Sequence, residues 1–399
     1  MRIGLYGISG VYNFGCEAIV RGATALFLSL YPDAKITYYS YNYDYDKEVL
    51  SDLSIDVFEL KIKKTIFRRL NNKIRTLLNC DKRQLFFDYK RIIDSNDVIV
   101  SIGGDIYTIP KYLRKQKEYP YYNPLVDFCE RAIRKGKRVI VYGGSVGPFG
   151  EYVKARNYYS KYLCKYSLIL CREWDSIKYL ESIGIRNVLF FPDPAFQVKG
   201  SNLCGEKENR IAVNLSPLSF FEYYGGISDD IYSRLAEMLD RIIERYAIDI
   251  LLVPHVIAQD PMDNDLEFLR KIFECSKSKE HIIIADYKGG FLGIKRQLDT
   301  CKLTIAARMH CAINSIVESV PTIFISYSQK SIGMCEYIYG DSKYVIRIED
   351  IDKILQKIMD EMLVDIDRIE NQLRIRTIEI EKEYNDGKDK IKKALEGRY

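Results

Sequence analysis

Two residues that could bind and protonate an anion stand together where an apolar segment ends. The stretch "LTIAARMHCAINS", residues 303–315, runs from a strand-like segment through Arg308 and His310 into a helix-like one. A guanidinium matches phosphate or carboxylate, and an imidazole exchanges protons near neutral pH. Because strand side chains alternate, we expect Arg308 and His310 to point to one side, beside the start of a helix at Cys311. The alternative is a purely structural His310.

Two further basic residues follow apolar segments. Arg172 comes directly after a strand-like run in "LILCREWDS", and Lys330 lies just past another in "ISYSQKSIGM". Arg172 could aim a planar set of donors at an anion, and Lys330 could bind the same anion as a point charge. A surface ion pair of Arg172 with Glu173 or Asp175 is the alternative.

Two glycine-containing stretches also follow strand-like runs. In "SIGGD", residues 101–105, Asp105 could accept hydrogen bonds from sugar hydroxyls or act as a base, or it could simply cap a helix or turn. In "YGISGVYNFGCEAI", residues 6–19, a helix beginning near Gly15 could present N–H groups to an anion. A tight turn is at least as good an explanation, and the glycines do not match the dinucleotide-binding pattern.

A metal site is not expected. The stretch "LLVPHVIAQDPMDND" places His255 near Asp260, Asp263 and Asp265, but a loop followed by a helix start explains it better than converging metal ligands. The ten cysteines are scattered and form no C-x-x-C pair, which argues against structural zinc. We expect no metal and no cofactor.

Short apolar runs alternate with helical patterns along the chain, which predicts an α/β fold with parallel, doubly wound sheets. The polar stretch "VKGSNLCGEKEN" interrupts this rhythm and predicts a linker. We expect two Rossmann-like domains facing across a cleft, where strand ends bind ligands. The predicted divisions are an N-terminal domain, a linker, a second domain and charged C-terminal helices: 1–197, 198–209, 210–345 and 346–399.

Composition favours a globular protein of the cytoplasm. Hydrophobic residues make up 47% of the 399 residues, and charged residues make up 29%. The sequence shows no signal peptide and no apolar run of about 18 residues, the length that would suggest a membrane span. The net charge of +5 gives no argument for nucleic acid.

A basic segment, residues 61–83, holds nine Lys or Arg and one Asp. Its apolar residues recur at helical spacing: Ile62, Ile66, Leu70, Ile74 and Leu77. Such an amphipathic helix could contact an anionic membrane surface, which would make the protein peripheral at the inner face of the membrane. The alternative is an ordinary domain helix whose apolar face packs into the core.

Taken together and in order, these motifs resemble the polysaccharide pyruvyl transferase family over roughly residues 1–345. The set is "NFGCEAI", "GGD", "GGSVGP", "CREWDS", "FPDPAF", "ARMHCAINS" and "YSQKSIG". The resemblance implies a fold similar to GT-B glycosyltransferases. It also implies transfer of the enolpyruvyl group of phosphoenolpyruvate onto two sugar hydroxyls, which forms a pyruvate ketal and releases phosphate. The residues implied for the phosphoenolpyruvate site are Arg172, Arg308, His310 and Lys330.

One motif departs from the family pattern. The first loop usually reads N-x-G-D-E, and here it reads "NFGCE", with Cys16 in the place of the aspartate. Asn13 and Glu17 are retained, and the resemblance implies that they bind the acceptor. The substitution puts the choice of acceptor in question.

The implied chemistry suits these residues. Phosphoenolpyruvate carries a phosphate and a carboxylate, which two arginines and a lysine can bind. Ketal formation requires protonation of the methylene carbon, for which we expect His310 to act as general acid and base. Asp105 would hold or deprotonate an acceptor hydroxyl. The expected partners are phosphoenolpyruvate and a sugar or lipid-linked glycan.

Two other functions stay open. The first is a GT-B glycosyltransferase that uses a nucleotide sugar, although retaining members often carry two glutamates eight positions apart, and here Glu318 has His310 at that offset. The second is a non-catalytic carbohydrate-binding relative.

Overall fold

The computed structural model describes residues 1–399 except for 63–65, 78–82, 84, 201–206, 327–328 and 398–399, and leaves undescribed the side chains of residues 68, 77, 329 and 330. The described chain forms two compact units. Unit 1 comprises Met1–Val11, Ile19–Gln197 and Glu383–Tyr399, and unit 2 comprises Tyr12–Ala18 and Val198–Lys382. The sequence did not predict that residues 12–18 pack with unit 2 or that the chain end packs with unit 1.

The core of unit 1 is a seven-stranded parallel sheet in the order β3-β2-β1-β4-β5-β6-β7. Its strands are β1 (Arg2–Tyr6), β2 (Lys35–Ser40), β3 (Asp56–Glu59), β4 (Val98–Ile102), β5 (Arg138–Gly144), β6 (Leu168–Cys171) and β7 (Val188–Phe190). The central strands are buried along their length, as is typical of parallel sheets covered on both faces.

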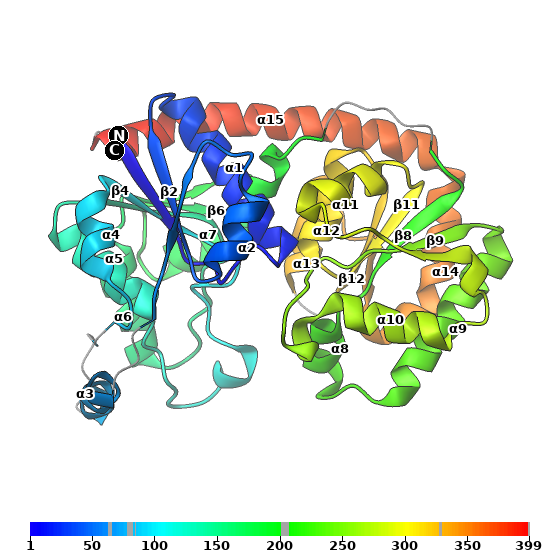
Figure 1. Ribbon diagram of the computed structural model, residues 1–399, viewed down its shortest axis with the longest axis horizontal. Coiled ribbons are helices and arrows are strands. Elements are labelled where there is room, and N and C mark those ends of the chain that lie inside the picture. Colours follow the sequence, from blue (N-terminus) through cyan, green and yellow to red (C-terminus); the bar gives the residue numbers. More distant parts are fainter. Residues whose placement is uncertain (63–65, 78–82, 84, 201–206, 327–328, 398–399) are drawn as a thin grey trace. The chain divides into compact units, whose positions relative to one another are not determined.

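Helices connect these strands, and all of them except α3 lie against the sheet or beside it (Figure 1). They are α1 (Phe14–Leu30), α2 (Tyr43–Val49), α3 (Ile66–Leu77), α4 (Tyr89–Ser95), α5 (Pro124–Arg134), α6 (Val153–Leu163) and α7 (Trp174–Ser182). Buried tyrosines, Tyr6, Tyr107 and Tyr159 among them, fill much of this core. Their rings supply a large apolar area, and the hydroxyl groups of Tyr6 and Tyr107 find partners inside the unit.

Unit 2 repeats the same architecture with a six-stranded parallel sheet in the order β10-β9-β8-β11-β12-β13. Its strands are β8 (Arg210–Asn214), β9 (Asp249–Leu252), β10 (Ile282–Ile284), β11 (Leu303–Ala306), β12 (Thr322–Ser326) and β13 (Val345–Arg347). Its helices are α8 (Pro217–Tyr224), α9 (Asp229–Tyr246), α10 (Asp265–Cys275), α11 (Gly290–Asp299), α12 (Met309–Val317), α13 (Gln329–Tyr339) and α14 (Ile351–Val364).

Both strand orders are of the Rossmann type, so the predicted α/β fold with two Rossmann-like domains is confirmed. In each unit the chain winds outward from a central pair of strands, β1 and β4 in unit 1 and β8 and β11 in unit 2. At such a switch point the connections leave on opposite faces, and the strands' carboxyl ends leave room for a ligand.

The predicted helical C-terminal segment is also present. It consists of α14 and the long helix α15 (Ile366–Glu396). In the part of α15 that belongs to unit 1, Gly387 lies against the buried ring of Phe191, and the ring of Tyr384 packs on the same phenylalanine. Among the described residues, no helix has the length and apolar character that crossing a membrane requires.

Candidate functional site

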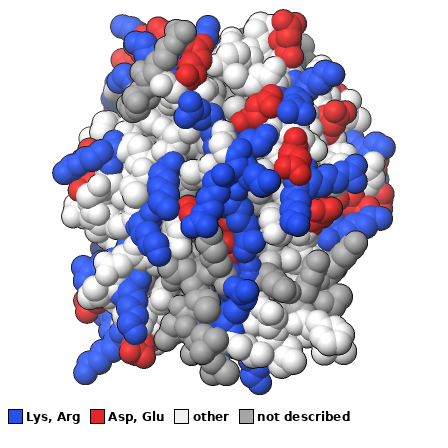
Figure 2. Space-filling view, turned by 90° about the vertical axis from the view of Figure 1, so that its left-hand side faces the viewer, with Lys and Arg blue, Asp and Glu red and all other residues white. Residues whose placement is uncertain are grey.

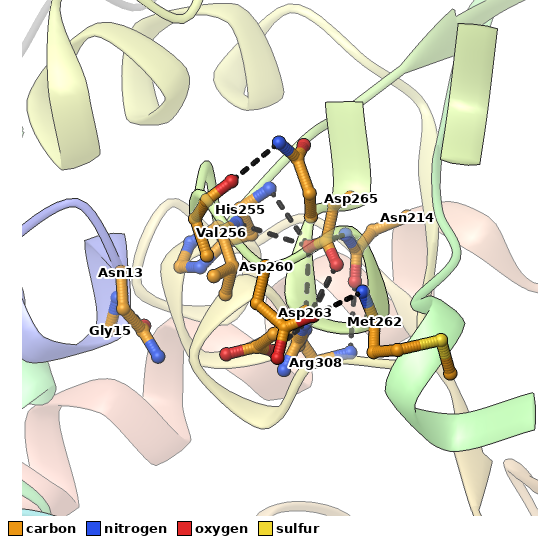
Figure 3. Close-up of polar contacts among 12 residues, drawn as sticks. Asn13, Gly15, Asn214, His255, Val256, Asp260, Met262, Asp263, Asp265 and Arg308 are labelled. Carbon is orange, nitrogen blue, oxygen red and sulfur yellow. Dashed lines mark hydrogen bonds and ion pairs between the residues drawn. The ribbon is translucent and has the colours of Figure 1, made fainter. Parts of the chain in front are cut away.

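The carboxyl end of the unit 2 sheet is tied together by a buried asparagine at the switch point (Figure 3). Asn214 is the last residue of β8, and its Oδ1 accepts a hydrogen bond from the N–H of Arg308 at 2.8 Å. Its Nδ2 donates to the carbonyl of Val253, just beyond β9, also at 2.8 Å. One side chain therefore fixes the ends of three neighbouring strands.

Arg308 caps a helix and does not continue the strand. β11 ends at Ala306, α12 begins at Met309, and the N–H groups of Cys311 and Ala312 donate to the Arg308 carbonyl. The expectation that Arg308 and His310 alternate along an extended segment is therefore wrong. The first turn of α12 determines where His310 points, and that helix end favours negative charge.

Two carboxylates hold the guanidinium of Arg308 (Figure 3). Its Nη2 donates to Asp263 at 2.6 Å and to Asp265 at 2.8 Å, and its Nε donates to Asp265 at 3.2 Å. These neighbouring charges raise the pKa of Arg308, so it stays ionised. Among the described residues, Nη1 has no acceptor of its own. The arginine thus keeps donors for a ligand, but much of its charge is already compensated.

Asp265 is fully buried and accepts hydrogen bonds from several directions. Besides Arg308, it accepts from the backbone N–H groups of His255 and Val256, both at 3.1 Å. Burial raises the pKa of Asp265, while Arg308 and these N–H groups act in the opposite direction. A buried carboxylate with this many donors serves to hold the strand ends and the guanidinium in place.

The acidic stretch after His255 is a loop and a helix start, as expected. Asp260 accepts from the N–H of Met262 at 3.0 Å, and Asn264 caps α10 by accepting from the N–H of Glu267 at 3.2 Å. Within the described ranges, no three or more His, Cys, Asp or Glu side chains come close enough to hold a metal ion.

Residues 12–18 reach His310 because they are bonded to the loop after β9. Asn13 forms an antiparallel bridge with Val256, and the N–H of Phe14 donates to the carbonyl of His255 at 3.0 Å. A Cβ atom at Gly15 would lie 2.4 Å from Nδ1 of His310. Only glycine leaves space for the half-buried imidazole at this point.

The predicted acceptor residues Asn13 and Glu17 both make contacts that stabilise helix starts. Oδ1 of Asn13 accepts from the N–H of Gly15 at 3.0 Å, so an N–H group that we expected to be open to an anion is already bonded. The carboxylate of Glu17 is buried and accepts from the N–H of Phe291 at 2.8 Å, in the first turn of α11. Their role in acceptor binding stays a prediction.

His255 is buried near His310 and Arg308. Its ring lies edge-on to Phe14 and Phe291, with centroid distances of 5.7 and 5.9 Å, and its Nε2 has no hydrogen-bond partner within the described chain. Burial lowers the pKa of His255 well below its usual value, and the positive charges of His310 and Arg308 lower it further. His255 is therefore neutral in the folded protein.

In unit 1, Arg172 lies at the carboxyl edge of the sheet and is almost fully buried. Its Nη1 donates to Asp193 at 2.8 Å, its Nη2 donates to Oγ of Ser145 at 3.3 Å, and Asp105 lies 4.0 Å from Nη2. The surface ion pair with Glu173 or Asp175 was therefore a wrong alternative. Asp105 is largely exposed, so it remains accessible to a ligand.

Lys330, the fourth predicted phosphoenolpyruvate residue, is in the first turn of α13. Its side chain lies outside the described part of the structure. Its role stays a prediction.

Three residues of these clusters were not assigned to the anion site from the sequence: Asp193, Asn214 and Asp265. Each had a usable signal, because Asp193 and Asn214 stand at strand ends and Asp265 follows an N-cap asparagine. A buried ion pair was also missed. Nζ of Lys295 lies 3.2 Å from Glu318, at the carboxyl end of α12, and burial lowers the pKa of Lys295 to about 8.

Comparison with known proteins identifies the family. The family model for polysaccharide pyruvyl transferases matches residues 13–329. The chain belongs to this family. The matched residues include Arg172, Arg308 and the loop at Asn13.

This chain is also similar in sequence to the amylovoran biosynthesis protein AmsJ of Erwinia amylovora. The two are 24% identical over 260 residues, which is 61% of this chain and 59% of AmsJ. The chain thus spans less than two thirds of the length of that relative.

Solved structures support the fold alone. HepE of Anabaena, in complex with UDP and glucose, superposes with a TM-score of 0.58 at 10% identity and full coverage of both chains. The UDP-GlcNAc 2-epimerase of Neisseria meningitidis gives a TM-score of 0.55 at 10% identity and covers 94% of each chain. At this identity the likeness confirms two Rossmann-like domains of the GT-B type and says nothing about the substrate.

We predict that the two acids at Arg308 differ in their effect on stability. Asp265→Asn should lower the free energy of unfolding by about 3–5 kcal/mol, because it leaves a largely buried guanidinium without its buried partner. Asp263→Asn should cost less than about 1 kcal/mol, because the side chain of Asp263 is 36% exposed and Arg308 keeps Asp265. Urea unfolding, monitored by circular dichroism, measures the free energy of unfolding of both variants. Equal losses would contradict the conclusion that Asp265 is the main partner of Arg308.

We also predict a loss of stability in mild acid that depends on His255. Its pKa is low in the folded state, so below the usual value of about 6.5 only the unfolded chain takes up this proton. The free energy of unfolding should then fall by up to about 1.4 kcal/mol per pH unit between about pH 6.5 and 5.

Unfolding curves at several pH values for His255→Gln test this prediction. The variant should show a shallower dependence on pH than the wild-type protein. His281→Gln, at an exposed histidine beside Asp249, is the matched control and should keep the wild-type dependence. Unchanged slopes in His255→Gln would show that His255 does not titrate in this way.

Proposed function

We propose that the protein transfers the enolpyruvyl group of phosphoenolpyruvate to two hydroxyls of a sugar in a polysaccharide or lipid-linked glycan precursor. The product is a pyruvate ketal, and phosphate is released. Family membership supports the general reaction. The observation that carries the proposal is the pairing of a fixed arginine, Arg308, with a half-buried histidine in the first turn of the next helix, at the switch point of unit 2.

The reaction is balanced without an oxidant or a reductant. A proton adds to the methylene carbon of phosphoenolpyruvate, and an oxocarbenium-like centre forms at the carbon that bears the phosphate. One sugar hydroxyl attacks that carbon, phosphate leaves, and a second hydroxyl completes the ketal. Of the two hydroxyl protons, one balances the proton added to carbon and the other leaves with phosphate.

His310 is the proposed general acid and base. Imidazole is the side chain best suited to exchange protons near neutral pH, and bound anions would favour its cationic form. Gly15 on one side and the first turn of α12 on the other leave the ring little freedom to move. A proton donor held on rigid elements needs little reorganisation when the substrate binds.

Anion binding in unit 2 would depend on several contributions together. Arg308 supplies a donor in a fixed plane, and the N-terminal end of α12 favours negative charge. Because Asp263 and Asp265 compensate much of the arginine charge, we propose that Lys330 and Arg172 also bind phosphoenolpyruvate. Asp105 is proposed to hold or deprotonate an acceptor hydroxyl, and Asn13 and Glu17 are proposed to help bind the acceptor.

We predict that the wild-type protein will consume phosphoenolpyruvate only when a suitable acceptor is present. Labelled phosphoenolpyruvate is incubated with a panel of sugars and lipid-linked glycans, and both phosphate release and the mass of the product are measured. His310→Asn should slow turnover by about 100-fold or more, because it removes the proton donor with little change in size. His281→Asn, the same substitution at an exposed histidine, should leave turnover unchanged.

Transfer from a nucleotide sugar in the same panel, without use of phosphoenolpyruvate, would overturn the proposal in favour of a glycosyltransferase. If His310→Asn consumed phosphoenolpyruvate at the wild-type rate, the proposed reaction would stand, but His310 would be excluded as its general acid and base.

A further inference from the structure

Helix α3 separates its apolar and polar residues completely. In a helix of 3.6 residues per turn, Ile66, Phe67, Leu70, Ile74 and Leu77 fall within an arc of roughly 100°. Every other position of the helix is Arg, Lys, Asn or Thr. In Figure 1, α3 lies apart from the helices that cover the sheet of unit 1.

The apolar face of α3 points away from the protein. The exposed fractions are 82% for Ile66, 86% for Phe67, 56% for Leu70 and 50% for Ile74. On the polar side, Asn71, Asn72 and Arg75 are half-buried. The sequence alternative, an ordinary helix with its apolar face in the core, is therefore wrong. Large apolar side chains gathered on one exposed face indicate a binding surface.

The charges in α3 and the sequence around it are almost all positive. α3 contains no acidic residue, and Arg69 and Lys73 are exposed next to the apolar arc. The surrounding sequence, residues 61–83, holds nine Lys or Arg and one Asp. Figure 2 views the molecule from the side on which α3 lies in Figure 1, and Lys and Arg side chains outnumber the acids there.

We propose that α3 binds the surface of an anionic lipid bilayer. Ile66, Phe67, Leu70 and Ile74 would enter the boundary between headgroups and acyl chains, and Arg69 and Lys73 would contact the anionic headgroups. A helix with a continuous apolar arc, a basic edge and no acid suits a wide negative surface without a defined shape. The inference does not depend on the proposed reaction, because α3 contains none of the residues assigned to it.

Another exposed apolar pair in the chain shows what distinguishes α3. Ile375 and Ile378 of α15 are 52% and 68% exposed, but α15 carries many acidic as well as basic residues. Glu379 forms an ion pair with Arg376 at 3.0 Å beside them. An anionic surface would be repelled by part of that face, so this pair provides a matched control for apolar exposure without charge complementarity.

The test is co-sedimentation of the full chain with vesicles. Vesicles of phosphatidylcholine alone are compared with an equal mixture of phosphatidylcholine and phosphatidylglycerol, at low and at high salt. We expect binding to the anionic vesicles at low salt, and binding weaker by about tenfold or more with neutral vesicles or at high salt.

Two paired substitutions separate the two components of binding. Phe67→Ser with Ile74→Ser should weaken binding by about tenfold or more through lost apolar insertion, and Arg69→Gln with Lys73→Gln should do so through lost charge. Ile375→Ser with Ile378→Ser should bind like the wild-type protein. Circular dichroism and thermal unfolding confirm that each variant is folded, as expected because all these side chains are exposed.

Insertion has an independent optical readout. A double variant places a single tryptophan on α3: Trp174, the only tryptophan of the sequence, is changed to Phe, and Phe67 is changed to Trp. The tryptophan emission of this variant should shift to shorter wavelength when anionic vesicles are added.

Equal vesicle binding by the wild-type protein and both α3 variants would overturn the proposal, as would an absence of binding by the wild-type protein. A wild-type dimer that becomes a monomer in Phe67→Ser with Ile74→Ser, without vesicle binding, would instead assign the face to a second copy.

Discussion

The ion pair between Arg308 and Asp265 is the interaction on which the unit 2 site depends. A carboxylate without exposed surface is stable inside a protein only when donors surround it. Here the donors come from Arg308, from the loop after β9 and from Asn214. Because these groups belong to different strand ends, satisfying one buried charge fixes the geometry of the whole carboxyl edge. Desolvation offsets much of the attraction within a buried ion pair, but removing one partner is strongly destabilising.

The same principle applies at the other end of α12. Glu318 follows the helix, pairs with buried Lys295 and accepts a hydrogen bond from the N–H of Gly200 at 3.1 Å. One helix is thus held by buried charges at both ends. His310, in its first turn, is positioned by that helix and by contact with Gly15. Burying these charges is electrostatically unfavourable, but their ion pairs fix the helix and so hold His310, the residue proposed to move a proton, in a rigid position.

The sequence predicted the fold and the places of the candidate residues well, but not their partners. Alternating apolar runs are a local signal, so both parallel sheets and the strand-end positions of Arg172 and Arg308 could be inferred. The partners Asp193 and Asp265 lie 21 and 43 residues away in the chain, and only the folded topology brings them to the arginines. The helix start at Met309 was also missed, because Ala306 and Ala307 suit a strand end and a helix equally. For α3, periodicity predicted an amphipathic helix but could not show which way its apolar face points.

The most direct measurement of the central claim is a calorimetric titration of phosphoenolpyruvate into the full chain and into Arg308→Lys. Lysine keeps the charge but loses the planar set of donors that lets a guanidinium hold Asp265 and a ligand together. The account predicts that the affinity falls by about tenfold or more in this variant. Arg296→Lys, at an exposed position of α11, should bind like the wild-type protein. Undiminished affinity in folded Arg308→Lys would contradict the account, because the anion would then be bound elsewhere.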